Sequence, residues 1–252
     1  MTGSWSLDDR SVSDVLAFTI VFGIVISSVG LVYTVGFGAL SEFQEGEQQT
    51  NAVRAFDAMS TTFDDIQDRG EPGRAGTLAL SGGTIQVVED SDITISVENA
   101  SGGEIWSTSR TTGSLRYTLE ETTVAYENGG VFRKDRDNSV LVSQPSIRCS
   151  PSSDRAVVSV VVLNGESGAK GGDTNVEIVS RENASRLVYL YPNRNLNGTA
   201  ASVNVTISGS SFDDAWNRHL ASSGWDDNGG GEYGCEATQI VVRVTVIDVD
   251  FQ

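Results

Sequence analysis

The sequence predicts an α+β protein with one long N-terminal helix and a mainly antiparallel, β-sandwich-like head that contains one short late helix. Three observations lead to this prediction. No charged residue occurs from Val15 to Leu40. Apolar residues then recur at helical spacing as far as Ile66. From Gly76 onward, short runs rich in β-branched residues alternate with turn signals.

The uncharged run is long enough to cross a bilayer. At 1.5 Å per residue, Val15 to Leu40 gives about 39 Å of helix, against roughly 30 Å of hydrocarbon. A cleaved secretory signal is the competing interpretation, but it would have a basic start and a shorter apolar stretch. The leader MTGSWSLDDR instead carries two aspartates and one arginine, so a retained, single-pass membrane helix is favoured.

Charges on either side of this run predict its orientation. Arg10 precedes it, whereas Glu42, Glu45 and Glu47 follow it and no basic residue occurs before Arg54. This asymmetry favours a cytoplasmic N-terminus and an extracellular head at the cell surface. Four glycosylation acceptor sequences agree with that orientation, although a chain rich in Ser, Thr and Asn can contain them by chance. They are centred on Asn99, Asn183, Asn197 and Asn204.

Small residues form one stripe along the predicted membrane helix, spaced three or four residues apart. They are Thr19, Gly23, Ser27, Gly30, Thr34 and Gly38. In lipid, small residues let a second helix approach closely, and van der Waals packing then drives association. The stripe therefore predicts a helix-packing face. The alternative is that Gly and Ser are simply frequent in membrane helices.

Beyond Leu40 the helix is predicted to continue and to become amphipathic. Its apolar positions follow an a/d-type pattern over two heptads, and Gly70-Glu71-Pro72-Gly73 ends it. These positions are Ala52, Phe56, Met59, Phe63 and Ile66. Two heptads are too few for an independent coiled coil, so we expect this seam to pack on the chain's own β domain or on neighbouring copies.

The residues before the apolar run resemble the class III signal of archaeal type IV pilin-like proteins. In that family a short polar leader ends in a basic residue and a small residue, and a prepilin peptidase cuts after the small one. The resemblance places the cut between Ser11 and Val12, with Arg10 as the basic recognition residue. It implies a leader at 1–11, a helix at 12–70 and an extracytoplasmic head at 71–252, which we divide into subdomains 71–150 and 151–252.

This resemblance implies a surface subunit that assembles through its helix, together with like subunits or other pilins, into a type IV pilus-like filament or pseudopilus. The alternative is a non-assembling single-pass surface protein whose β head is a binding or adhesion module. The sequence departs from the family pattern at Ser11, where Gly or Ala is usual, and at Leu16, where bacterial-type pilins have glutamate. Asp14 is the nearest acidic residue.

Composition limits the partners. The formal net charge of −17 repels phosphate backbones, so no nucleic-acid partner is expected. Only Lys134 and Lys170 are lysines. High acidity with few lysines is typical of halophilic proteins, because molar salt screens repulsion beyond about 3 Å; an ordinary acidic secreted protein is the alternative.

Cys149 and Cys235 could form one disulfide or remain as two buried thiols, and the disulfide is favoured.

Within the head, Gly82-Gly83 and Asn128-Gly129 each predict a hairpin. A helix over 212–222 is predicted to bury Phe212, Trp216 and Leu220, with His219 at the surface or as a cap.

We expect no enzyme, no cofactor and no metal site, since nucleotide-binding and catalytic motifs are absent and His219 is the single histidine. The acidic, Gly-rich loop at 226–232 is the best Ca²⁺ candidate, but it lacks EF-hand spacing.

Overall fold

The structure, a computed structural model, describes residues 8–165, 168–191 and 200–252. Its first element is the helix α1, Asp8–Arg69. The predicted single long helix is therefore confirmed. It ends where Gly70 takes a left-handed conformation (φ +67°) and donates its N–H to the carbonyl of Ile66 at 3.2 Å. The chain divides into two compact units, one up to Gln48 and one from Gln49 onward.

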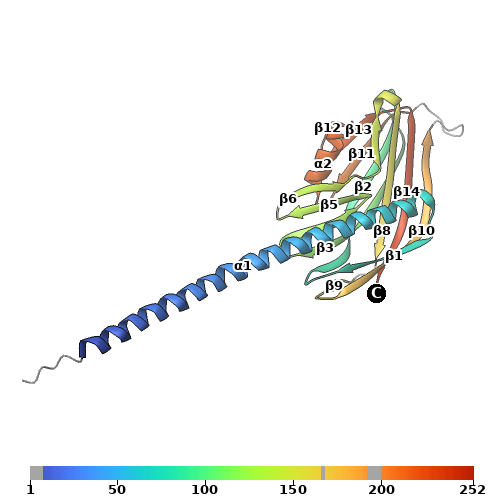
Figure 1. Cartoon of the computed structure of the whole chain (residues 1–252). Coiled ribbons are helices and arrows are strands. Elements are labelled where there is room, and N and C mark those ends of the chain that lie inside the picture. The colour runs from blue at the N-terminus through green and yellow to red at the C-terminus, as the bar shows by residue number, and fades with distance from the viewer. Residues whose placement is uncertain (1–7, 166–167, 192–199) are drawn as a thin grey trace, which may run out of the picture. The chain divides into compact units, whose positions relative to one another are not determined.

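The second unit is a head built from two sheets and one short helix (Figure 1). The first sheet has five strands in the order β1-β10-β14-β8-β7. Their bounds are Gly73–Ala79 for β1, Asn175–Tyr191 for β10, Gln239–Phe251 for β14, Arg155–Gly165 for β8 and Ile147–Ser150 for β7. All neighbouring strands in it are antiparallel except β14 and β8, which are parallel.

The second sheet has the order β12-β13-β11-β2-β3-β4-β5-β6, and every pair in it is antiparallel. The bounds are Asp226–Gly229 for β12, Glu232–Glu236 for β13, Ala200–Ser208 for β11, Thr84–Asn99 for β2, Glu104–Leu119 for β3, Thr122–Glu127 for β4, Gly130–Asp135 for β5 and Asn138–Ser143 for β6. The short β9, Lys170–Gly171, pairs with β2, and a 3₁₀ turn spans Pro151–Ser153.

The inner faces of the two sheets form one hydrophobic core, as alternation along half-buried strands requires. Ile95 of β2, Val205 of β11 and Val242 of β14 are fully buried in it. The late helix α2, Asp213–Ser222, adds Trp216 and Leu220 to this core, each 1% exposed. The predicted burial of that helical stripe is confirmed.

The last five turns of α1 belong to the core of the head. Ala52, Phe56, Phe63 and Ile66 are buried in a second cluster with side chains of both sheets. The end of α1 is also tied to the head by polar contacts, since Arg243 Nη1 on β14 lies 2.8 Å from Asp68 Oδ1. We expected the amphipathic seam to pack either on the chain's own β domain or on neighbouring copies, and it packs on the chain's own β domain.

Three sequence-based expectations need correction or confirmation. Residues 71–150 and 151–252 do not form separate subdomains, because each sheet combines strands from both ranges. The predicted Gly82-Gly83 hairpin is wrong, because the strands on either side of these glycines do not pair with each other. β1 pairs with β10 in the first sheet, whereas β2 belongs to the second sheet, between β11 and β3. The Asn128-Gly129 hairpin is confirmed, with β4 and β5 paired and positive φ values of 47° and 88° at the turn.

Candidate membrane-anchoring segment and head pocket

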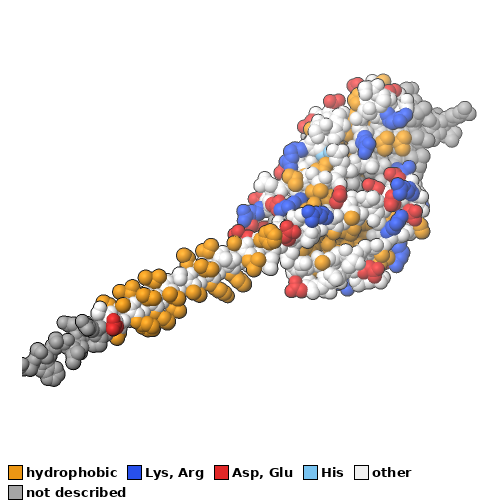
Figure 2. Space-filling model, in the orientation of Figure 1, with side chains coloured by type: hydrophobic (Ala, Val, Ile, Leu, Met, Phe, Trp, Pro, Cys, Tyr) orange, Lys and Arg blue, Asp and Glu red, His pale blue; other side chains and the backbone are white. Residues whose placement is uncertain are grey.

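The first unit exposes almost all of its hydrophobic side chains. Of the large hydrophobic residues that are exposed in the described parts of the chain, all but Val140 and Val142 lie between Val15 and Phe43. Figure 2 shows these side chains gathered along the N-terminal helix, whereas the head displays mixed acidic and basic groups. Each such side chain gains about 1.5–3 kcal/mol on leaving water, so this helix requires an apolar covering.

This helix meets the length and composition required for a membrane span. The apolar part of α1 has a mean hydropathy of 2.6 in its best window, and none of that window is buried within the chain. The absence of burial separates it from the core helix of a soluble domain, which would be covered by its own fold. Among the residues that the structure describes, one helix is therefore a candidate membrane anchor, and it lies near the N-terminus.

The predicted stripe of small residues is uncovered. A Cβ added at Gly23, Gly30 or Gly38 would meet nothing within 4 Å apart from the helix itself. Thr19 and Thr34 donate their hydroxyls to the carbonyls of Val15 and Gly30, at 2.8 and 3.1 Å. Such internal hydrogen bonds satisfy the hydroxyl donors without water, so this face is compatible with lipid or with another helix. The remaining stripe residue, Ser27, is exposed as well.

The predicted processing site lies at the start of α1. Arg10, Ser11 and Val12 fall within the backbone of the helix, which begins at Asp8. The first seven residues of the predicted leader lie outside the described residues. The cut between Ser11 and Val12 remains a prediction.

The two cysteines are joined in the structure. Cys149 on β7 and Cys235 on β13 form a disulfide whose Cα atoms are 5.8 Å apart. Because β7 belongs to the first sheet and β13 to the second, the bond links the two layers of the head directly. It closes a chain segment with a sequence separation of 86, and in the simplest chain-entropy view a loop of that length loses about 4–5 kcal/mol of unfolded-state entropy.

The predicted glycosylation positions differ in exposure. Asn183 is exposed at an irregularity of β10 and donates to Asp248 Oδ2 at 2.8 Å. Asn99 ends β2 and accepts two turn N–H groups through Oδ1. Asn204 is only 6% exposed within β11. Asn197 lies outside the described residues.

The acidic segment at 226–232 forms the β12–β13 hairpin rather than a ligand loop. Asp227 Oδ1 accepts the Gly229 N–H at 2.8 Å, and Asn228 Nδ2 donates to Glu232 Oε1 at 3.2 Å. Within the described ranges, no group of three or more His, Cys, Asp or Glu side chains is placed to hold a metal ion. The Ca²⁺ candidate is thus a hairpin whose polar groups bond one another.

A buried polar contact fixes α2 on the second sheet. Trp216 Nε1 donates to Glu127 Oε1 at 2.9 Å, and Glu127 is 1% exposed. Arg116 Nη2 lies 3.8 Å from Glu127 Oε2 and 2.7 Å from Asp90 Oδ1. Burial raises the pKa of Glu127, while hydrogen bonds from Ser210 and Trp216 and the Arg116 charge act in the opposite direction. This contact orients the helix on which His219 lies.

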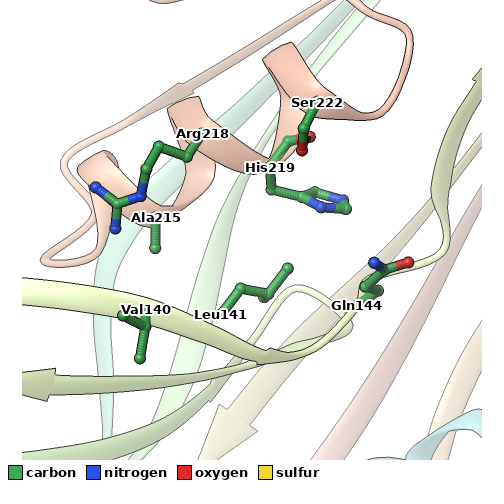
Figure 3. A pocket seen from close by; sticks show the side chains of 7 residues that line it. All are labelled: Val140, Leu141, Gln144, Ala215, Arg218, His219 and Ser222. Atoms are coloured by element: carbon green, nitrogen blue, oxygen red, sulfur yellow. Dashed lines mark hydrogen bonds between the residues drawn. The ribbon is translucent and has the colours of Figure 1, made fainter.

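Of the two positions predicted for His219, at the surface or as a cap, the surface is wrong, because the residue is only 6% exposed. Its Nδ1 lies 3.2 Å from Oγ of Ser223, the residue that caps α2. The ring of His219 lines a pocket of 210 Å³ between α2 and β6. Figure 3 shows the pocket walls: Ala215, Arg218, His219 and Ser222 come from α2, and Val140, Leu141 and Gln144 come from β6 and the residue that follows it. No local sequence pattern indicates this pocket, because it depends on contacts between residues that are 76 and 79 positions apart.

The fold and the exposed segment together define a chain with one candidate membrane-spanning helix and a β-sandwich head. The chain belongs to DUF7289, a family of unknown function, whose model matches residues 10–252. No curated protein and no solved structure matches the chain.

Proposed function

We propose that this protein is a pilin-like, membrane-anchored surface subunit that assembles through α1 into a type IV pilus-like filament or pseudopilus. The observation that carries the proposal is the contrast within one helix. From Val15 to Phe43 its large apolar side chains are exposed, whereas from Ala52 to Ile66 its apolar seam is buried in the head. An anchor and a folded head therefore share one continuous helix.

The exposed half of α1 suits both the membrane-anchored subunit and the assembled filament. Before assembly, its apolar side chains partition into lipid. In a filament the same side chains would pack against those of other copies, and Gly23, Gly30 and Gly38 leave open space for that approach. The N-terminus would be cytoplasmic and the head extracellular, with a prepilin peptidase as the processing partner.

The assembly claim can be tested with two identical substitutions on different faces of α1. Gly30→Leu fills the small-residue face, whereas Gly36→Leu adds the same side chain about 240° around the helix. Neither glycine has any atom within 4 Å of an added Cβ, so both variants keep the fold of the chain. We expect Gly30→Leu to abolish filaments or oligomers and Gly36→Leu to retain them. Equal assembly of both variants would exclude the small-residue face as the packing surface.

Processing is tested by the mass and the first residue of the mature protein. The proposal predicts that the mature chain begins at Val12. Recovery of a mature protein that begins at Met1 or Thr2 would contradict the processing step, while leaving membrane anchoring by α1 intact. Electron microscopy of cells with and without the protein then shows whether a filament depends on it.

A second candidate is a non-assembling surface protein whose head binds a ligand. The pocket between α2 and β6 favours it, as do Val140 and Val142, the exposed large hydrophobic residues that the described part of the head presents. Monomeric protein in the membrane, with no filament lost on deletion, would select this candidate over the first.

A further inference from the structure

The α2–β6 pocket combines an apolar floor with a polar rim. Leu141 and Ala215 supply the apolar surfaces that face each other, Val140 borders the pocket with its side chain pointing away from α2, and Gln144, Arg218 and His219 supply the polar groups (Figure 3). Its 210 Å³ is below the roughly 300–1,000 Å³ of pockets for drug-sized ligands. A molecule the size of a monosaccharide or smaller suits this volume.

The charge around the pocket is unusual for this chain. The sequence contains 34 acidic residues and has a net charge of −17, yet no Asp or Glu lines the pocket and one arginine does. Arg218 donates through Nη2 to the carbonyl of Ser139, which holds the guanidinium beside β6. A guanidinium has five N–H donors in a planar fork that matches a carboxylate, so most of its donors remain for a ligand.

His219 supplies the second indication. Its Nε2 is buried and has no hydrogen-bond partner among the residues that the structure describes. Its Nδ1 lies 3.2 Å from Ser223 Oγ. Burial lowers the pKa of the imidazole, so the ring is neutral at pH 7. When the Ser223 hydroxyl donates to Nδ1, the ring proton sits on Nε2, and a buried N–H without an acceptor is destabilising by about 1–3 kcal/mol.

We propose that this pocket binds a small hydroxylated carboxylate, such as an acidic sugar or a hydroxy acid. The carboxylate pairs with Arg218 at one end of the pocket. Hydroxyl groups of the ligand meet the Gln144 amide and His219 at the other end, where Figure 3 places these two side chains. Because Nε2 is covered in the structure, contact with it requires a rotation of the imidazole ring. The carbon skeleton rests on Leu141 and Ala215. This site lies wholly within the head and does not depend on assembly through α1.

The single histidine makes the test direct. In full-length protein in detergent micelles, labelled with ¹⁵N-histidine, both imidazole nitrogen signals come from the one histidine, His219. Titrations with glucuronate, lactate, acetate and glucose separate recognition of the carboxylate from recognition of the hydroxyl groups. We expect saturable shifts with glucuronate or lactate at roughly millimolar concentrations, a reasonable affinity for so small a ligand. Tighter binding of glucuronate than of lactate identifies an acidic sugar, and the reverse identifies a free hydroxy acid.

Variants assign the binding to this pocket. Arg218→Gln should weaken binding at least tenfold, and Arg110→Gln, a change at an exposed arginine on β3, should leave it unchanged. Because Arg218 also contacts Ser139, Gln144→Leu provides a second variant: the Gln144 side chain is exposed and no hydrogen bond to it is found in the described chain. The proposal is overturned if neither hydroxy acid gives a saturable shift. It is equally overturned if acetate or glucose binds as tightly, or if both pocket variants bind as the unchanged protein does.

Discussion

Replacing Phe63 by alanine tests whether the second half of α1 is part of the core of the head. Phe63 is 1% exposed, and its ring centroid lies 4.4 Å from that of Tyr126 on β4. Phe→Ala changes at such sites cost about 3–5 kcal/mol, from lost burial and from the cavity left behind. Part of the Phe63 environment is also aromatic, and a tilted ring pair adds about 0.5–1.5 kcal/mol, so we expect the upper part of this range.

The measurement is urea unfolding of the full-length protein in detergent micelles, followed by the fluorescence of Trp106, Trp216 and Trp225 in the head. With a denaturant slope of about 2–3 kcal/mol/M, a loss of about 4–5 kcal/mol lowers the midpoint by about 1.3–2.5 M. Phe43→Ala is the matched control, because Phe43 lies on the same helix but is 66% exposed; its midpoint should change by less than about 0.3 M. If Phe63→Ala lowered the free energy of unfolding by less than about 1 kcal/mol, the assignment of this seam to the core of the head would be refuted.

Three further predictions concern the head. The pKa of Asp64 is raised to about 6 by burial first and then by Asp68 and Asp65, so the folded state binds a proton more tightly than the unfolded state between pH 3.8 and 6. The charged carboxylate is therefore destabilising above pH 6. Replacing Asp64 by asparagine should stabilise the protein at pH 7 by roughly 1–2 kcal/mol after solvent screening. Unfolding titrations at several pH values should show that this gain disappears as the pH falls toward 4. Replacing Cys149 and Cys235 together by serine should lower stability by about 2–4 kcal/mol in the same assay, and an unchanged midpoint would mean that the bond does not constrain the unfolded chain. Glycopeptide mass spectrometry should find Asn204 unmodified because its side chain is buried; a glycan there would contradict the position of β11 inside the sheet.

Much of the fold follows from local sequence signals. The uncharged run is long enough to span a bilayer as a helix, and the a/d seam has a helical period. The end of α1 at Arg69 could therefore be predicted to within one residue, whereas its start at Asp8 lies four residues before the predicted start at 12. Asn128-Gly129 formed its hairpin because both residues adopt positive φ at low cost. These elements depend on neighbours within a few residues, which is the range over which sequence patterns carry structural information.

The glycine pair at 82–83 shows why a local signal can mislead. A Cβ on Gly83 would lie 2.4 Å from the ring of Tyr117, whose hydroxyl donates to the Leu80 carbonyl at 2.6 Å. Glycine is required there for the close approach of an aromatic ring, at the point where the chain passes from one sheet to the other. A hairpin and a sheet crossing both select glycine, and the residues alone do not distinguish them.

Non-local pairing accounts for the other errors. The parallel pairing of β8 with β14 joins Ala156 to Ile240 and Leu163 to Ile247. Both strands are rich in valine, as strands buried on both faces are, but composition does not specify a partner. That pairing places the last strand of the chain in the middle of the first sheet, which merges the two ranges that we predicted as subdomains.

The position of His219 is set in the same non-local way. In the sequence it stands between Arg218 and Leu220, outside the helical stripe of Phe212, Trp216 and Leu220, and for this reason we predicted it at the surface or as a cap. Burial follows because β6 lies against that side of α2: the Ala215 N–H bonds to Ser139 Oγ at 3.2 Å, and Leu141 packs below the ring. The rim of the pocket is therefore a product of sheet topology. Its polar residues come from two segments with no shared motif, so sequence patterns do not reveal the pocket, whereas the candidate membrane anchor in α1 is visible in the sequence alone.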